Sequence, residues 1–341
     1  MPESQLHNKI KQSVNRQKNI FLLGSKEEHA ILKEWAENHS KNRFHLNGWF
    51  HDKDIPASAL ELIDEYNEMA KEGKVDHFVL DPSDMDHAML QASIDWAESR
   101  GSRIHLIQSG TSSVISKLDK LNRFGPFAAV PLRQEPLSFR RNQLIKSMFD
   151  KGFALVVAIT ILWWFIPLIG LLIKLNNSKG PVLIQQDRIG FNGQKYKCFK
   201  FRTMISDKNA EKGYGVITKE NDRRITLIGK FLRKSNLDEL PQFLNVLKGD
   251  MSIIGPRPNP IKEDEEISDK IEKYRIRRFV KPGITGYAAV KGFRGSTFNM
   301  DLMQKRIDID IDYIENWSLF LDIKIFFMTI WQMLTFSTGA R

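Results

Sequence analysis

The feature that most limits how this chain can fold is an uninterrupted apolar segment near its middle. Residues Phe153 to Ile173 include no charged side chain, and an α-helix needs roughly 20 such residues to cross a bilayer. A buried core helix is the alternative interpretation, but so long an uncharged run is unusual in soluble proteins. Lys146, Lys151 and Lys174 flank both ends of the run, so its positive charges indicate no orientation. The segment therefore predicts a membrane-associated helix.

Pro167 determines which kind of membrane helix we expect. A simple span would place the two halves of the chain on opposite sides of the bilayer, although neither half resembles a secreted domain. Pro167 lies about two-thirds along the run, where it removes a backbone hydrogen bond and favours a kink. A kinked helix that enters the bilayer and returns to the same face keeps both halves on one side. The sequence thus predicts a re-entrant helix with its break at Pro167.

A second apolar stretch, from Trp317 to Leu334, lies near the end of the sequence. Asp322 and Lys324 interrupt it, which fits a core helix or a helix that lies in the headgroup layer. Tryptophans at 317 and 331 favour the second interpretation.

Composition sets broader limits. With 341 residues the chain can hold two domains, and its 42% hydrophobic and 27% charged residues are typical of folded proteins. A net charge of +10 suits nucleic acid, anionic lipid or phosphorylated substrates without choosing among them. The single cysteine, Cys198, excludes internal disulfides and cysteine-based zinc clusters.

The N-terminal half alternates apolar runs with helical patterns after a tail predicted to be flexible over residues 1–18. Strands are predicted over 19–23, 44–50, 77–81 and 103–108, and helices over 27–38, 58–72 and 84–99. This alternation predicts an α/β fold with a small, Rossmann-like parallel sheet covered by helices. The first strand–helix turn has one glycine and two glutamates, so the G-x-G-x-x-G fingerprint is absent. We therefore favour a structural, regulatory or self-associating module over a nucleotide-binding one. Three prolines within 124–142 predict an extended linker.

The strongest chemical signal is an acidic pair, Asp238 and Glu239, which is followed by Arg257 between two prolines. Acids close to a fixed guanidinium suit chemistry on a phosphate, because one side supplies a nucleophile or holds a metal and the other neutralises oxyanions. The alternative is helix capping, because Ser235-x-x-Asp238 matches a capping box. A helix N-terminus also suits phosphate, so the two interpretations are compatible.

Further charged residues accompany this pair. Lys200 and Arg202 are expected to share one face of a strand over 196–204 and could hold a diphosphate, although an ordinary solvated face explains them equally simply. Arg233 shortly precedes the acids, and Arg278 precedes a Lys-Pro-Gly turn. Asp310 is one of three alternating aspartates in a predicted helix, of which one or two would point into a site. A nucleophile elbow, a Walker A motif and zinc-ligand spacing are all absent from the sequence.

From about residue 140 onward, the chain resembles the bacterial sugar transferases known as monotopic polyprenyl-phosphate phosphoglycosyl transferases. The resemblance rests on an ordered series of motifs: Lys179-Gly-Pro-Val, Gln186-Asp-Arg-Ile-Gly, Lys200-Phe-Arg-Thr-Met, Leu237-Asp-Glu-Leu-Pro-Gln, Asn245-Val-Leu-Lys-Gly-Asp-Met-Ser, Gly255-Pro-Arg-Pro, Lys281-Pro-Gly-Ile-Thr-Gly and Asp310-Ile-Asp-Tyr-Ile. The N-terminal half resembles the Rossmann-like domain of longer members. In those members the domain follows several transmembrane helices that this sequence does not show, so the role of this half and the oligomeric state stay open.

The resemblance implies a domain organisation and a location. An accessory domain over 19–135 would precede a linker and re-entrant helix over 136–175, and an α+β catalytic domain with amphipathic interfacial helices would occupy 176–341. Both domains would face the cytoplasm at the bacterial inner membrane. Their partners would be a UDP-sugar, polyprenyl phosphate and membrane lipids, without nucleic acid, and a homo-oligomer is left open.

The resemblance also implies a mechanism. Asp238 would attack the β-phosphate of a UDP-sugar, release UMP and form a phosphosugar–aspartyl intermediate, which undecaprenyl phosphate would then attack. Mg²⁺ held near Asp238 and Glu239 would neutralise phosphoryl charge. Phosphate-binding roles would fall to Lys200, Arg202, Arg233, Arg257 and Arg278, with Asp310 as a further site acid. The product would begin exopolysaccharide, O-antigen or capsule synthesis.

Two alternatives remain at this point. A membrane-anchored nucleotide or nucleic-acid binder would show salt-sensitive binding and no turnover. A scaffold for glycan assembly would use the two acids only to cap a helix. The donor sugar is open, with UDP-glucose and UDP-galactose preferred.

Overall fold

The computed structural model describes residues 17–38, 43–51, 56, 58–69, 74–83, 85–107, 123–176, 180–205, 222, 224–293 and 299–335. The chain divides into two compact units, Met1–Gln134 and Glu135–Arg341. Most of the tail predicted over 1–18 lies outside the described residues, and Lys18 is the first residue of strand β1.

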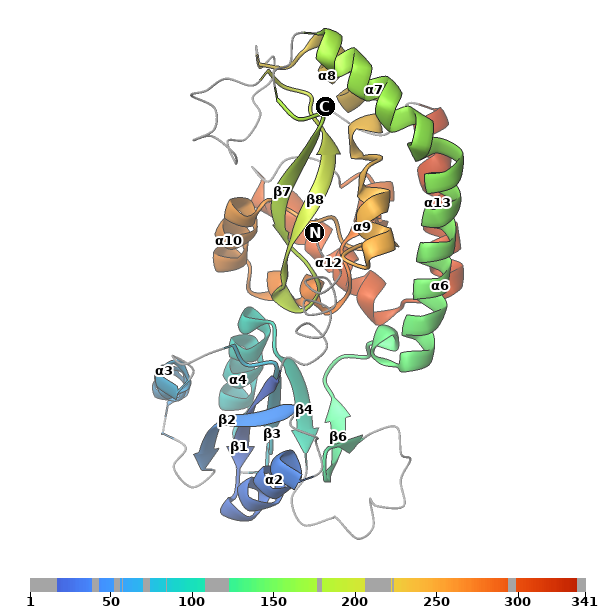
Figure 1. The fold of residues 1–341 in the computed structure, drawn as a ribbon. Coiled ribbons are helices and arrows are strands. Elements are labelled where there is room, and N and C mark those ends of the chain that lie inside the picture. Colours follow the sequence, from blue (N-terminus) through green and yellow to red (C-terminus); the bar gives the residue numbers. More distant parts are fainter. Residues whose placement is uncertain are drawn as a thin grey trace. The chain divides into compact units, whose positions relative to one another are not determined.

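A mixed sheet forms the first unit (Figure 1). Its strand order is β2-β1-β3-β4-β6-β5, in which the first four strands are parallel and the last two antiparallel. The elements are β1 (Lys18–Gly24), α2 (Lys26–Asn38), β2 (Phe44–His51), α3 (Ala59–Met69), β3 (His77–Leu80), α4 (His87–Arg100), β4 (Arg103–Ile107), β5 (Arg123–Phe124) and β6 (Phe127–Pro131). The predicted parallel sheet with alternating helices is thus confirmed.

The extended linker predicted over 124–142 is wrong for its first part. Phe124 and Phe127 pair across a tight turn at Gly125, which has a φ of 59°. Phe124 and Ala129 are buried in the hydrophobic cluster on one face of the sheet. Burial of this hairpin outweighs the preference of its prolines for an extended linker.

In the turn between β1 and α2, the side chain of Glu28 caps the start of the helix. The Ser25 backbone N–H donates to Glu28 Oε2 at 2.9 Å, and the Glu28 N–H donates to Ser25 Oγ at 3.3 Å. This reciprocal pair is a capping box. A Cβ on Gly24 would lie 2.3 Å from Glu28 Oε2, so the carboxylate needs glycine beside it. The position at which a parallel α/β sheet often binds a phosphate is therefore filled by a buried carboxylate.

The second unit begins with a continuous helical segment, Arg140–Leu175, whose 36 residues make it the one helix of the described chain that is long and apolar enough to cross a membrane. It comprises α6 (Arg140–Val157), a π-helical turn η4 (Ala158–Leu162) and α7 (Trp163–Leu175). Figure 1 shows the bend between α6 and α7.

The break at Pro167 stays a prediction, and the structure shows an irregular stretch shortly ahead of this residue. The α-helix α7 continues through Pro167, and the irregular turn lies ahead of it, where the Trp163 N–H bonds to the Ala158 carbonyl. A proline ring clashes with the carbonyl four residues earlier, which here is Trp163. The disturbance therefore falls on the preceding turn, where Trp164 Nε1 donates to the Thr160 carbonyl at 2.8 Å.

The rest of this unit surrounds two small sheets. Strands β7 (Leu183–Ile189) and β8 (Lys195–Phe201) form an antiparallel hairpin, in which β8 overlaps the strand predicted over 196–204, and β9 (Ser252–Ile254) pairs in parallel with β10 (Gly283–Thr285). The remaining elements are η3 (Pro136–Ser138), η5 (Phe191–Gly193), α8 (Leu227–Lys234), η7 (Leu237–Glu239), α9 (Gln242–Lys248), α10 (Ile261–Lys270), η8 (Glu272–Phe279), α11 (Tyr287–Val290), α12 (Met300–Glu315) and α13 (Leu319–Leu334).

The long helix and α13 each bury charged side chains against the rest of the unit. Asp322 is fully buried and accepts hydrogen bonds from Lys146 Nζ at 2.7 Å, Tyr313 Oη at 2.8 Å and Trp317 Nε1 at 3.0 Å. Asp150 of α6 accepts from the Ile253 N–H at 3.1 Å. Lys146, Asp150 and Asp322 thus bind these helices to the core, while Lys151, Lys174 and Lys324 are exposed.

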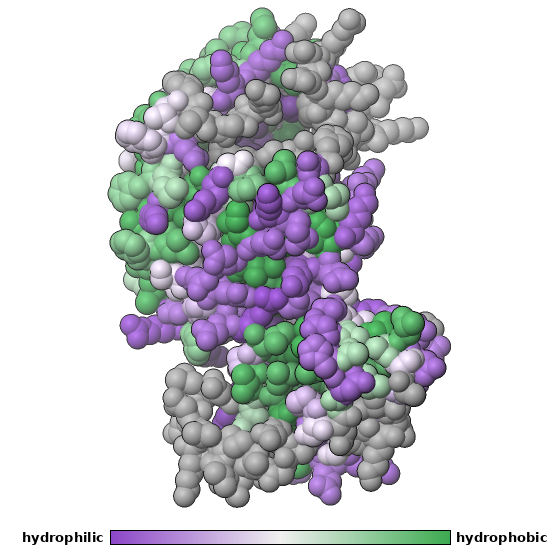
Figure 2. All heavy atoms as spheres, turned by 180° about the vertical axis from the view of Figure 1, so that it is seen from behind, coloured by the Kyte–Doolittle hydropathy of each residue, from purple (hydrophilic) through white to green (hydrophobic). Residues whose placement is uncertain are grey.

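The outer faces of the same helices are correspondingly apolar. Figure 2 shows hydrophobic residues along the left edge of the second unit, where α6, α7 and α13 lie. Exposed apolar side chains include Met148, Leu155, Ile159, Trp163, Leu171, Phe320, Phe327 and Trp331. So many large apolar side chains exposed along neighbouring helices are unusual for a soluble protein.

Candidate active site

The acidic pair lies on a short 3₁₀ turn between two helices. Helix α8 begins at the Thr226 cap, whose side chain accepts from the Gly229 N–H, and ends at Ser235. Asn236 then adopts a left-handed conformation, with a φ of 55°, and reverses the chain into η7. Ser235 Oγ donates back to the Phe231 carbonyl at 2.8 Å. Among the residues that the structure describes, no side chain caps η7, so the capping box predicted from Ser235 and Asp238 is wrong.

Glu239 is held by two cations. Arg257 forms a fork on it, with Nη1 donating to Oε2 at 2.9 Å and Nη2 donating to Oε1 at 2.7 Å. Lys200 Nζ also donates to Oε1, at 2.8 Å. Glu239 is only 8% exposed, and although burial opposes ionisation, Arg257 and Lys200 hold its pKa well below the usual value. Glu239 is thus a fixed anion.

Asp238 differs from its neighbour in every one of these respects. It is partly exposed, and no described residue donates a hydrogen bond to its side chain. Burial and the negative charge of Glu239 raise its pKa, while Lys200, Arg233 and Arg257 act in the opposite direction. The pair therefore consists of one carboxylate fixed by cations and one carboxylate that is free to react or to bind a ligand.

The backbone around Arg257 explains two of the glycine motifs. The Gly255 N–H donates to the Thr285 carbonyl, and the Gly283 N–H donates to the Pro256 carbonyl, each at 3.0 Å. A Cβ on Gly283 would lie 2.2 Å from the Gly255 nitrogen, and one on Gly255 would lie 2.4 Å from the Lys281 carbonyl oxygen. Only glycine permits this approach, which fastens the Pro-Arg-Pro segment to β10.

Of the other predicted site residues, some lie at the acidic pair and others bind different groups. Lys200 joins the acidic pair, and Arg233, whose Nε donates to Thr203 Oγ1 at 2.9 Å, acts electrostatically on Asp238. Arg202 Nε instead donates to the Pro181 carbonyl at 2.8 Å. Arg278 is bonded to Asp264, which also accepts from Tyr274 Oη. Among the described residues, the hydrogen bonds of Arg202 and Arg278 thus lie with groups other than the acidic pair.

Asp310 is buried and accepts from Arg277 Nε at 2.8 Å. Arg277 Nη2 in turn donates to the Arg257 carbonyl at 2.7 Å, and Arg306 Nη2 donates to the same oxygen at 3.2 Å. These two arginines were not among the predicted site residues. Arg306 and Asp310 are four residues apart on a helix. This spacing is the only sequence signal that could have linked Arg306 to a predicted site residue.

The residues present suit a magnesium site that the protein would complete together with the substrate phosphates. Among the described residues there is no group of three or more potential His, Cys, Asp or Glu ligands. Both oxygens of Glu239 accept hydrogen bonds from cations, which leaves Asp238 as the available carboxylate. Mg²⁺ is commonly bound through one or two carboxylates together with substrate phosphates. Asp238 fits that pattern, whereas Glu239 would first have to release a cation.

Comparison with known proteins shows the family of the chain. The family model described as "Bacterial sugar transferase" matches residues 141–336. Over 316 residues, covering 89% of this chain and 64% of the relative, the chain is 36% identical to UDP-glucose:undecaprenyl-phosphate glucose-1-phosphate transferase of Escherichia coli (strain K12). The protein of the same name in Klebsiella pneumoniae is 34% identical, with 85% of this chain and 62% of that protein covered.

A shorter relative delimits the shared part. The exopolysaccharide production protein PSS of Rhizobium leguminosarum bv. phaseoli is 40% identical over 199 residues, which cover 58% of this chain and 98% of that protein. The chain spans less than two thirds of the length of the E. coli and Klebsiella relatives. The family match includes the acidic pair, the Pro-Arg-Pro segment and the long apolar helix, and on this evidence the chain belongs to the bacterial sugar transferase family.

Proposed function

We propose that this protein transfers a sugar-1-phosphate from a UDP-sugar to undecaprenyl phosphate, giving undecaprenyl-diphospho-sugar and UMP. The observation that carries the proposal is the division of roles within the acidic pair. Glu239 is fixed by Arg257 and Lys200, while Asp238 beside it has a free carboxylate. The names of the E. coli and Klebsiella relatives support the same reaction with UDP-glucose as donor.

The reaction would take place in two displacements. An Asp238 carboxylate oxygen attacks the β-phosphorus, the bond from that phosphorus to the bridging oxygen breaks, and UMP leaves with the electron pair. An oxygen of undecaprenyl phosphate then attacks the same phosphorus, and the acyl-phosphate bond breaks to restore the carboxylate. Arg257, 32% exposed, can still reach a phosphate while it holds Glu239. Asp238 would hold Mg²⁺ together with the donor diphosphate. The bound ion would neutralise part of the phosphoryl charge.

A panel of UDP-sugars tests this function. With undecaprenyl phosphate and Mg²⁺ in detergent, UDP-glucose should release UMP and transfer sugar phosphate to the lipid, ahead of UDP-galactose. UMP should also appear in less than one equivalent without the lipid, because the first displacement does not need it. Salt-sensitive nucleotide binding without UMP release from any donor would instead identify a binder or scaffold.

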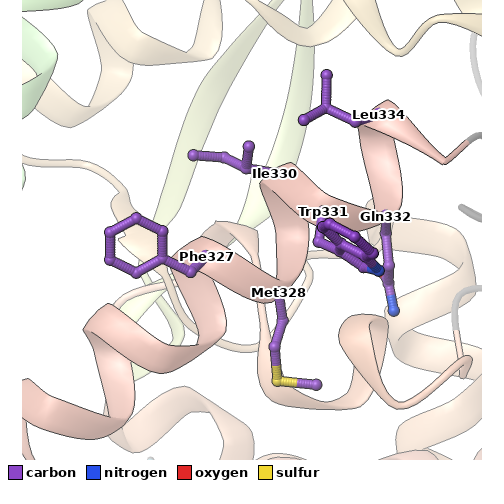
Figure 3. A pocket seen from close by; sticks show the side chains of 6 residues that line it. All are labelled: Phe327, Met328, Ile330, Trp331, Gln332 and Leu334. Carbon is purple, nitrogen blue, oxygen red and sulfur yellow. The ribbon is translucent and has the colours of Figure 1, made fainter.

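We also propose that the second unit lies on the membrane through a re-entrant helix and interfacial helices. The apolar outer faces of α6, α7 and α13 support this, as do the exposed Leu227 and Phe231 on α8, the helix that leads into Asp238. An apolar hollow on α13 is lined by Phe327, Met328, Ile330, Trp331, Gln332 and Leu334, and Figure 3 shows Phe327, Ile330 and Leu334 on one side of the helix. Such faces bind the boundary between headgroups and acyl chains.

Cysteine labelling tests this topology at the inner membrane. Cys198 is buried, and a Cys198→Ser background allows single cysteines to be placed at Gln17 and Thr335. In intact spheroplasts both should resist a membrane-impermeant maleimide, and both should react after permeabilisation, because a re-entrant helix keeps both units in the cytoplasm. Labelling of only one of the two in intact spheroplasts would indicate a true span.

A further inference from the structure

Arg306 of α12 is an unusual buried cation. Its side chain is 5% exposed, and its Nη2 donates to the Arg257 carbonyl at 3.2 Å and to Asn259 Oδ1 at 3.5 Å. Within the described residues it forms no ion pair with a carboxylate. Burial, and to a lesser extent the positive charge of Arg277, lower its pKa to about 10.

Packing alone does not explain an arginine at this position. A buried cation without an ion-pair partner is costly, and an apolar side chain of similar volume commonly replaces buried charge without loss of stability. The guanidinium instead makes a charge-assisted hydrogen bond to one particular main-chain oxygen. That oxygen belongs to Arg257, whose side chain holds Glu239 beside Asp238.

The Arg257 carbonyl accepts from two buried guanidinium groups. Arg277 donates to it at 2.7 Å and is itself oriented by Asp310, while Arg306 lies one helical turn before Asp310 on α12. Pro256 and Pro258 restrict the backbone on both sides. The backbone at Arg257 is thus fixed by the prolines on both sides and by the two guanidinium groups that bind its carbonyl oxygen.

We propose that Arg306 is a positioning residue, which through its bond to the Arg257 carbonyl fixes the direction of the Arg257 guanidinium towards Glu239 and the donor diphosphate. The inference rests on the proposed phosphoryl transfer. It assigns Arg306 no contact with the reacting atoms.

Two substitutions separate positioning from packing. Arg306→Met keeps the volume but removes the charge and the donor, and kcat for UMP release should fall about 10- to 100-fold, the equivalent of one charge-assisted hydrogen bond. The Tm in detergent should stay the same or rise, because an unpaired buried charge is removed. Arg306→Lys keeps a charged donor and should restore kcat to within a few-fold. Lys305→Met, an exposed neighbour on α12, is the matched control and should leave both quantities unchanged.

Two results would overturn the proposal. One is wild-type kcat and KM in Arg306→Met, and the other is a loss of activity that follows a fall in Tm and is not restored by lysine. UDP binding, measured as the rise in Tm on adding UDP and Mg²⁺, keeps this test separate from the proposed function. Should the wild-type protein release no UMP, the proposed function fails. In that case UDP binding alone tests the inference, which fails if Arg306→Met leaves the UDP-dependent Tm rise unchanged.

Discussion

Replacing Asp238 with asparagine should lower UMP release from the UDP-sugar by at least about 1,000-fold, the scale expected when a covalent nucleophile is lost. Asparagine keeps the size of the side chain but has no anionic oxygen to attack phosphorus. The fold should tolerate the change, because no described residue donates a hydrogen bond to the Asp238 side chain. The measurement is UMP release in detergent with undecaprenyl phosphate and Mg²⁺, with Tm as the check on folding.

Mass spectrometry of the wild-type protein, quenched with donor but without lipid acceptor, should detect a sugar-phosphate adduct on the peptide that contains Asp238. Asp269→Asn serves as the control, because Asp269 is 74% exposed on α10 and, within the described part of the chain, pairs only with Arg275. Near-normal turnover by Asp238→Asn would refute the nucleophile assignment, and so would a requirement for both substrates before any UMP appears.

The same carboxylate should set the acid limb of the pH–rate profile. Burial and Glu239 raise the pKa of Asp238 above 3.8, and the nucleophile must be deprotonated. UMP release should therefore fall, as pH decreases, at a higher pH than an ordinary aspartate would produce. Glu239 should not contribute to this limb, because its pKa is held well below the usual value.

Replacing Arg257 with glutamine should have the second-largest effect, and should reduce both activity and stability. Activity should fall about 100- to 1,000-fold, as when one oxyanion donor is removed. Of its described cations, Glu239, 8% exposed, would then retain Lys200 alone, and breaking a buried pair in this way costs about 3–5 kcal/mol of unfolding free energy. Arg257→Lys should be intermediate, because lysine keeps the charge without the two-pronged fork.

The double variant Arg257→Gln with Glu239→Gln separates the two effects. Removing the acid as well eliminates the uncompensated charge, so much of the lost stability should return while activity stays low. The non-additive part measures the coupling between the two side chains. Simply additive losses of stability would show that Arg257 is not the principal partner of Glu239. Wild-type turnover in Arg257→Gln would show that Arg257 is not a phosphate clamp.

Local patterns in the sequence were sufficient for much of this description. Apolar runs that alternate with helical patterns correctly indicated the parallel sheet of the first unit, because this alternation can be read from consecutive segments of the chain. The prolines were less reliable. The stretch 124–142 includes a paired hairpin, since cross-strand packing outweighs the preference of its prolines for an extended chain.

Sequence alone determined that this chain has a long apolar helix, an acidic pair and a proline-bounded arginine, because each is a property of adjacent residues. Only the tertiary structure decided that Glu239 is bound by Lys200 and Arg257 while Asp238 stays free, and that Asp322 faces inward. The reason is that ion pairing and burial depend on groups far apart along the chain. Two neighbouring carboxylates that look alike in sequence acquire opposite pKa shifts from the residues that folding places around them.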